Sequence, residues 1–131
     1  MAEVAIRDDG NMDAEAPREC VSEDGREVWL HSGRLSSGWM TAMPEWIRSL
    51  PAPTSLELSY NQLPVLPDWV GTLASLTALD AQHNQLTELP GWLANLTALT
   101  TLDLRGTRLA ETPSWLRNLT SLTSLHLDDT T

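Results

Sequence analysis

One pattern of residues occurs three times in succession in this sequence, at a constant spacing of 23 residues. The middle copy, Leu76–Ala98, reads LTALDAQHNQLTELPGWLANLTA. The other two copies, Pro53–Ser75 and Leu99–Ser121, adjoin it without a gap. Tandem units of this length predict a solenoid, in which each unit packs only against its neighbours.

Each copy has two halves with different apolar spacing. The first half follows L-x-x-L-x-L-x-x-N-x-L, as in Leu76, Leu79, Ala81, Asn84 and Leu86, and its central alternation predicts a short strand. The second half has apolar residues three to four apart after a proline, as in Leu89, Pro90, Trp92, Leu93 and Leu96. That spacing predicts a short helix or 3₁₀ turn. One unit cannot bury its leucines alone, so stacked units must share a core.

This pattern resembles the leucine-rich repeat family, in the 23-residue form common in bacterial proteins. The resemblance implies an α/β repeat solenoid, an arc with parallel strands on a concave face and short helical or 3₁₀ segments on a convex face. It also implies protein binding without catalysis. It names no particular partner.

The residues before the regular repeats divide into a tail and a cap. Residues 1–18 are acidic and have no apolar period, which predicts a disordered tail. The repeat domain then spans residues 19–131, beginning with a cap at about residues 19–27. Asp24 and Gly25 form a turn signal within this cap. The sequence permits either a hairpin that uses Val21 or a short helix that ends near Asp24.

The first repeat has two possible registers. Strict spacing places Gly33 and Leu35 at the strand positions, whereas the alternative places Val28 and Leu30 there and requires a five-residue insertion around Ser36–Ala42. The residues around Val28 favour a strand more strongly, so we prefer the second register. The predicted units are then residues 28–52, 53–75, 76–98, 99–121 and a partial repeat at 122–131. Because this last unit has no second half, we expect self-association through the uncapped C-terminal repeat.

Residues that flank the strand leucines are expected to project from the concave face. The position between two strand leucines holds Trp29, Glu57, Asp80, Asp103 and His126. Neighbouring columns add Arg105, Tyr60 and His83. Parallel strands lie about 4.8 Å apart, so the three acids would form a row of carboxylates that favours a basic protein partner. Such a row costs stability and folding does not require it, which favours binding over a solvated face without a task.

Two further columns predict parts of the scaffold. Asn61 and Asn84 occupy a buried turn, where an amide can bond to backbone groups; Thr107 and Thr130 replace them in later repeats. The four tryptophans at the same repeat position are Trp46, Trp69, Trp92 and Trp115. We expect a packed ladder with Trp69 and Trp92 buried at its centre, rather than an exposed docking stripe.

Composition argues against several function classes. The net charge of −10 opposes binding to nucleic acid and to anionic membranes. The chain has one cysteine, Cys20, and no apolar segment follows Met1, so we predict a cytoplasmic protein. The chain has arginine but no lysine, which hints at a bacterial origin. No motif of a catalytic triad is present, and His31, His83 and His126 fall at different repeat positions. We therefore expect no enzyme activity, no metal and no cofactor.

The sequence thus predicts a non-catalytic protein-binding module that uses its concave strand face. Two alternatives stay open. The chain could be the recognition fragment of a larger signalling or effector assembly whose catalytic part is elsewhere, or a degenerate repeat fragment without a function of its own.

Overall fold

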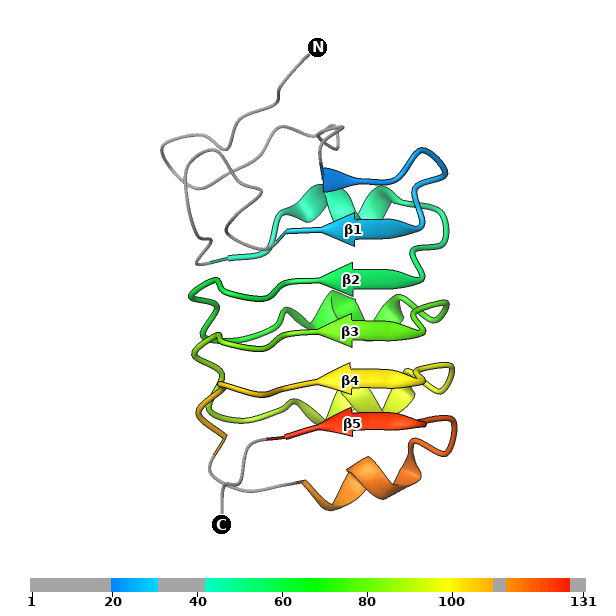
Figure 1. Ribbon diagram of the computed structural model, residues 1–131. Coiled ribbons are helices and arrows are strands. Elements are labelled where there is room, and N and C mark those ends of the chain that lie inside the picture. Colours follow the sequence, from blue (N-terminus) through cyan, green and yellow to red (C-terminus); the bar gives the residue numbers. More distant parts are fainter. Residues whose placement is uncertain (1–19, 31–41, 110–112, 128–131) are drawn as a thin grey trace.

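A computed structural model describes residues 20–30, 42–109 and 113–127. The predicted acidic tail at residues 1–18 lies outside the described residues, as do Thr130 and nearly all of the predicted insertion around Ser36–Ala42. The remaining residues form a stack of similar coils, which is the predicted repeat solenoid (Figure 1).

Five short parallel strands form one sheet in sequence order within the described part of the chain. They are β1 (Glu27–Trp29), β2 (Ser55–Glu57), β3 (Ala78–Asp80), β4 (Thr101–Asp103) and β5 (Ser124–His126). Equivalent residues of successive repeats pair directly, so Leu79 lies opposite Leu56 and Leu102. Val28 pairs with Leu56, which confirms the second of the two registers for the first repeat.

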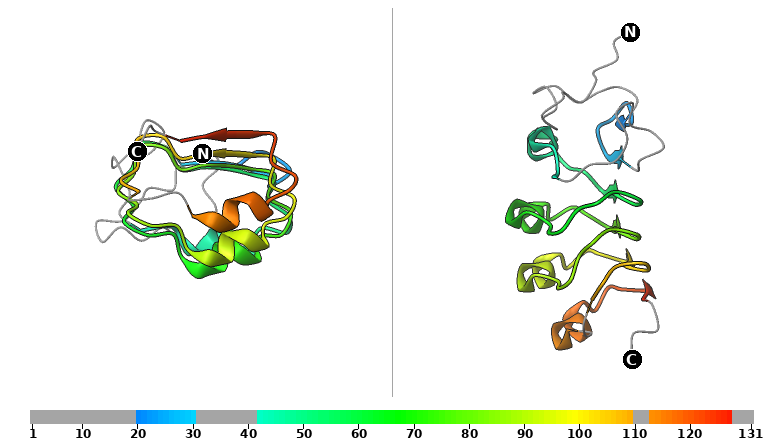
Figure 2. Two further views of the ribbon diagram at one scale, coloured as in Figure 1. Left: turned by 90° about the horizontal axis from the view of Figure 1, so that it is seen from below. Right: turned by 90° about the vertical axis from the view of Figure 1, so that its left-hand side faces the viewer.

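A single turn of 3₁₀ helix returns the chain on the side opposite the sheet (Figure 2). These turns are η3 (Glu45–Ser49), η4 (Asp68–Thr72), η5 (Gly91–Asn95) and η6 (Ser114–Asn118). A proline in extended conformation precedes each of them, as Pro90 does before η5 with φ −69°. Proline is pre-set for this entry because its ring fixes φ and it has no N–H to satisfy. None of these helical turns in the described ranges is long or apolar enough to span a lipid bilayer.

The hydrophobic core lies between the sheet and the 3₁₀ turns. The central residue of each of the middle strands is almost completely buried, as Leu79 is at 1% exposure. The residues on either side of it point outward, because successive side chains of a strand alternate between faces. We call this outward surface of β1–β5 the strand face; it is the face that the sequence predicts to be concave.

The buried asparagines stabilise the turns after the strands, as predicted. The Nδ2 group of Asn84 donates to the carbonyl oxygens of Leu58 at 2.8 Å and Ala81 at 3.3 Å, and its Oδ1 accepts the N–H of Leu63 at 3.0 Å. Asn61 donates in the same way to the carbonyl of Leu30 at 2.7 Å. Each asparagine therefore connects its own turn to the preceding repeat.

A row of threonine hydroxyls connects the repeats at the other end of the strands. The hydroxyls of Thr77, Thr100 and Thr123 each donate to the backbone carbonyl of the equivalent residue one repeat earlier, at 3.0–3.2 Å. Together with the asparagines, these bonds hold successive strands in register at both ends.

The cap is a hairpin, which decides between the two alternatives. Val21 forms an antiparallel bridge with Val28 on β1. Gly25 adopts φ +74° in the turn. The carboxylate of Asp24 accepts bonds from the Ser22 hydroxyl and the backbone N–H of Arg26, and these bonds hold its pKa below its usual value. The hairpin places the thiol of Cys20 in the core, at 3% exposure.

The tryptophan row is only partly the expected ladder. Trp46 and Trp69 are buried, but Trp92 is half-buried, so the prediction that both central tryptophans are buried is wrong. The difference in burial between Trp69 and Trp92 depends on the residue that stands two positions after the tryptophan of the preceding repeat. The guanidinium carbon of Arg48 lies 5.8 Å from the ring of Trp69, whereas Gly71 holds the equivalent place beside Trp92 and offers no side chain to cover it.

Candidate functional site

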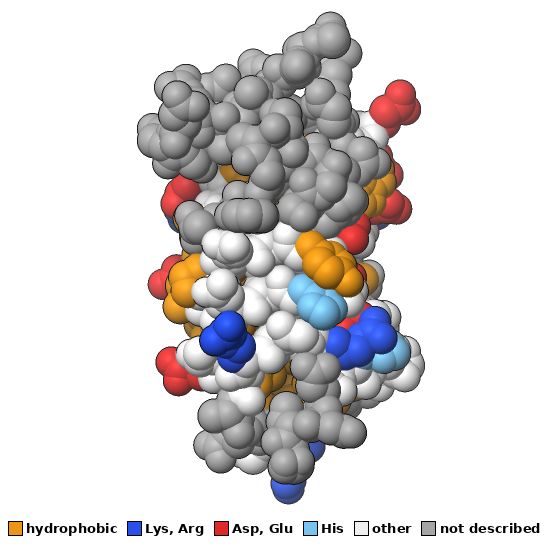
Figure 3. Space-filling view, turned by 60° about the vertical axis from the view of Figure 1, so that its left-hand side comes forward, with side chains coloured by type: hydrophobic (Ala, Val, Ile, Leu, Met, Phe, Trp, Pro, Cys, Tyr) orange, Lys and Arg blue, Asp and Glu red, His pale blue; other side chains and the backbone are white. Residues whose placement is uncertain are grey.

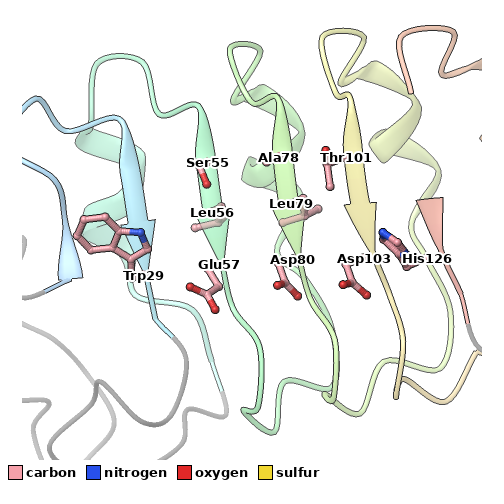
Figure 4. Close-up of a pocket in the computed structure, with 10 residues that line it drawn as sticks. All are labelled: Trp29, Ser55, Leu56, Glu57, Ala78, Leu79, Asp80, Thr101, Asp103 and His126. Carbon is pink, nitrogen blue, oxygen red and sulfur yellow. The ribbon is translucent and has the colours of Figure 1, made fainter. Parts of the chain in front are cut away.

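Five outward side chains form a row across the strand face, one from each strand (Figure 4). They are Trp29, Glu57, Asp80, Asp103 and His126, the column that the sequence predicts between the strand leucines. With Ser55, Ala78 and Thr101 they line a cavity of about 300 Å³. The strand register brings these residues together, because equivalent positions in successive repeats lie side by side.

Two of the three acids also have structural roles. The Oδ1 atom of Asp80 accepts the backbone N–H of Gln82 at 3.2 Å, and that of Asp103 accepts the N–H of Arg105 at the same distance. An aspartate that bonds to the backbone two residues ahead stabilises the end of its strand. Asp80 and Asp103 therefore contribute to the local structure of their strand ends, a role that the sequence analysis did not assign to them.

Asp103 is neutralised by an arginine of its own repeat. The guanidinium of Arg105 donates from Nε to Oδ1 at 3.0 Å and from Nη2 to Oδ2 at 2.7 Å. Burial raises the pKa of Asp103, whose exposure is 7%, but the bonds from Arg105 outweigh burial and hold the pKa below its usual value. The hydrogen bonds and the charge of Asp103 in turn raise the pKa of Arg105. The predicted row of three equivalent negative charges is therefore corrected to two.

The other two acids receive only neutral donors among the described residues. The Nε2 group of Gln82 donates to Asp80 at 3.1 Å and reaches Asp103 at 3.4 Å. The hydroxyl of Ser59 donates to Glu57 at 3.2 Å. The donor two residues after the acid thus changes from a hydroxyl on the β2 repeat to an amide on β3 and a guanidinium on β4. The sequence analysis placed Arg105 in a column beside the acids, but it did not predict that the residues of this column bind the acids.

An aromatic stack is formed by two residues that follow the ends of β2 and β3. Figure 3 shows a hydrophobic side chain lying against a histidine on the surface. The rings of Tyr60 and His83 have centroids 4.5 Å apart and are nearly parallel, at 14°. Both residues have positive φ, 59° for Tyr60 and 55° for His83, a backbone region that costs free energy for residues with side chains. Gly106 holds the next equivalent position, where an added Cβ would overlap the His83 ring. This glycine makes room for the stack.

His126 closes the row on β5 and lies next to Ser124. Its Nε2 atom is 2.9 Å from the Ser124 hydroxyl, and both side chains are at the surface of the strand face. Across the described ranges, no group of three or more His, Cys, Asp or Glu residues is arranged to hold a metal ion. His31 lies outside the described residues, so the predicted separation of the three histidines is not tested.

A family model described as "Leucine rich repeat" matches residues 65–109, which contain β3, β4 and the turns between them. These residues form part of the leucine-rich-repeat solenoid.

A solved leucine-rich-repeat protein of Leptospira interrogans is similar to most of the chain. The two are 29% identical in sequence and superpose with a TM-score of 0.59 over 76% of this chain. The match covers 24% of the Leptospira protein, so this chain spans about a quarter of its length. No match to a curated protein was found.

The repeat consensus explains the inward leucines and the asparagines, but it assigns no role to the residues on the strand face. The structure brings five of the eight predicted binding residues into one cavity and places the other three, Tyr60, His83 and Arg105, two or three residues after strand ends. That these residues bind a partner stays a prediction.

Proposed function

We propose that this chain binds another protein through the strand face and catalyses no reaction. The observation that carries the proposal is the cavity of about 300 Å³, whose lining combines Trp29 and His126 with two carboxylates that receive only neutral hydrogen-bond donors among the described residues. Inward positions of the repeats are nearly uniform, whereas these outward positions differ from repeat to repeat. Repeat proteins use such extended faces for recognition.

The chemistry of the lining favours a protein partner. Small-molecule sites are mostly apolar cavities of about 300–1,000 Å³ that enclose their ligand. Here the lining comes from an open sheet and is more polar than apolar. Aromatic residues beside charged ones are typical of protein interfaces, where they supply the anchoring contacts. Glu57 and Asp80 favour a partner that presents basic side chains there.

Site-specific photo-cross-linking tests which face is used. A photoreactive amino acid replaces Ala78, which lines the cavity on β3, and in a separate variant Ala74, which is exposed after η4 and does not line the cavity. The two positions carry the same native residue and lie four residues apart in the sequence, so they form a matched pair. We expect a defined cross-linked product in a lysate of the source organism from position 78 and none from position 74.

Excess wild-type chain without the photoreactive amino acid should suppress the cross-linked product, because it occupies the limited number of binding sites on a specific partner. A product from position 74 alone, or one that does not compete, contradicts binding through the strand face.

A second candidate function has one observation in its favour. The chain spans about a quarter of the length of its Leptospira neighbour, which shows that such a repeat array can form part of a longer protein. In that case the strand face is the recognition part of a larger assembly, and the same cross-linking experiment applies to the full assembly.

A further inference from the structure

We propose that the strand face binds an arginine side chain of its partner, with the guanidinium placed between Glu57 and Asp80. This inference rests on the proposed function, because it names the group that the face recognises. Three features of the described residues support it: a guanidinium already bound in the row, the pattern of donors along the row, and the shape and lining of the cavity.

The row already binds one guanidinium within the chain. Arg105 makes two bonds to the carboxylate of Asp103, at 3.0 and 2.7 Å, in the forked geometry that arginine forms with carboxylates. The carboxylates of the row are therefore presented at an angle that a guanidinium can meet from the strand face. A partner's arginine would meet Asp80 or Glu57 as Arg105 meets Asp103.

The remaining acceptor capacity is greatest at the other end of the row. A carboxylate has about four sites for accepting hydrogen bonds. Among the described residues, Glu57 receives a single side-chain bond, from the Ser59 hydroxyl, and Asp80 receives one bond from the Gln82 amide and one from the backbone. Within the described ranges, the ion pair on this face is that of Arg105 with Asp103. Among the described residues, the hydrogen bonds to Glu57 and Asp80 come from neutral donors, which do not cancel the carboxylate charges.

The cavity favours arginine over lysine. Glu57 and Asp80 are register partners on β2 and β3, so their side chains leave the sheet about 4.8 Å apart. A planar guanidinium with five N–H groups can donate to both carboxylates at once, whereas an ammonium acts as a compact point charge. Trp29 lines the cavity next to Glu57, and guanidinium groups pack well on indole rings.

An NMR titration of the full chain tests the inference with three blocked tripeptides. They carry arginine, lysine or citrulline between two glycines. Citrulline has the shape of arginine but no charge. We expect the arginine peptide to bind with a Kd in the millimolar range, as suits a single side chain, and to shift the signals of Glu57, Asp80 and the Trp29 indole. The citrulline peptide should bind at least about tenfold more weakly, and the lysine peptide should fall between the two.

Variants of the chain locate the site. Glu57→Gln should weaken binding of the arginine peptide several-fold, whereas Glu88→Gln, which removes an exposed acid outside this cavity, should leave it unchanged. Arg105→Gln places on the β4 repeat the glutamine that the β3 repeat has at the equivalent position, Gln82, and it removes the ion pair of Asp103. We expect the arginine peptide then to shift the Asp103 signals as well.

Three outcomes would overturn the inference: equal binding of the arginine and citrulline peptides, no saturable shift at Glu57 and Asp80 up to about 20 mM peptide, or no shift at Asp103 in Arg105→Gln. The proposed function is judged separately. If cross-linking from position 78 succeeds while the arginine peptide fails, the strand face binds its partner through other chemistry. If cross-linking from position 78 also fails, the proposed function is wrong as well.

Discussion

Replacing Asn84 with alanine should be among the most damaging single changes outside the leucine core. The change removes the donor to the Ala81 carbonyl, at 3.3 Å, and the acceptor for the N–H of Leu63, at 3.0 Å. The Leu58 carbonyl, which Asn84 also contacts, keeps a bond from Asn61 at 3.1 Å. The variant therefore leaves two backbone groups unpaired in a buried turn.

The size of the effect follows from those two groups. Each buried polar group without a partner costs about 1–3 kcal/mol, and the longer bond belongs in the lower part of that range. We expect Asn84→Ala to lower the free energy of unfolding by about 2–4 kcal/mol, out of a total of about 5–15 kcal/mol for a domain.

The reverse change is available one repeat later. Thr107 donates its hydroxyl to the Leu104 carbonyl at 2.8 Å, the bond equivalent to that of Asn84 with Ala81. By equivalence, an asparagine there would also accept the N–H of Leu86 and donate to Ala81. Thr107→Asn should therefore raise the free energy of unfolding by about 1 kcal/mol, the net value of a typical added hydrogen bond.

Urea unfolding followed by circular dichroism measures both changes, with Asn95→Ala as the matched control. Asn95 is exposed at the end of η5, so its loss should change the free energy of unfolding by less than about 0.5 kcal/mol. The reasoning is refuted if Asn84→Ala costs no more than Asn95→Ala, or if Thr107→Asn is destabilising.

The remaining predictions concern the convex side and the acid row. Gly71→Ala should destabilise the domain and raise the exposure of Trp92, because the new Cβ would lie 2.8 Å from the Trp92 ring. Gly91→Ala should do neither, because a Cβ there has no atom within 4 Å. Unfolding followed by fluorescence checks both variants, and equal effects would contradict the packing. Trp46→Ala should cost more than Trp92→Ala, at about 3–5 kcal/mol for a buried tryptophan, and the reverse order in calorimetry would contradict the burial difference. Because the pKa of Asp103 is lowered, its carboxylate contributes stability that is fully present above the unfolded-state pKa of about 3.9 and is lost as the pH falls through the folded-state pKa. The thermal midpoint of Asp103→Asn should thus approach that of the wild type as the pH falls below the folded-state pKa, and a difference that stays constant with pH would exclude this contribution.

The repeat period predicted most of the fold because it constrains many positions at once. A shift of one residue in the strands would turn every inward leucine outward, so the leucine spacing fixes the register. The same reasoning placed Val28 at a strand centre despite the irregular first repeat, and the pairing of Val28 with Leu56 confirms it. The asparagine positions were predictable because an amide in a tight buried turn has few possible partners other than the backbone.

The details of the candidate site depend on contacts between repeats that no single-repeat pattern contains. The half-burial of Trp92 results from Gly71 in the preceding repeat, and the stack of Tyr60 on His83 requires both residues to adopt positive φ. A consensus treats these positions as variable. Their conformation follows from which side chain stands beside them in the neighbouring coil, and the sequence gives that only once the register is known.

The acid row combines stability and recognition unequally along its length. On β4, Asp103 is buried, bonds to its own backbone and pairs with Arg105, so a variant there changes folding as well as any binding. Glu57 on β2 is half-exposed and bonds only to the Ser59 hydroxyl among the described residues. Exposed substitutions without such structural contacts are usually close to neutral for stability. Loss of binding in Glu57→Gln with unchanged unfolding would therefore report recognition alone, which is why the β2 end of the row is the place to test it.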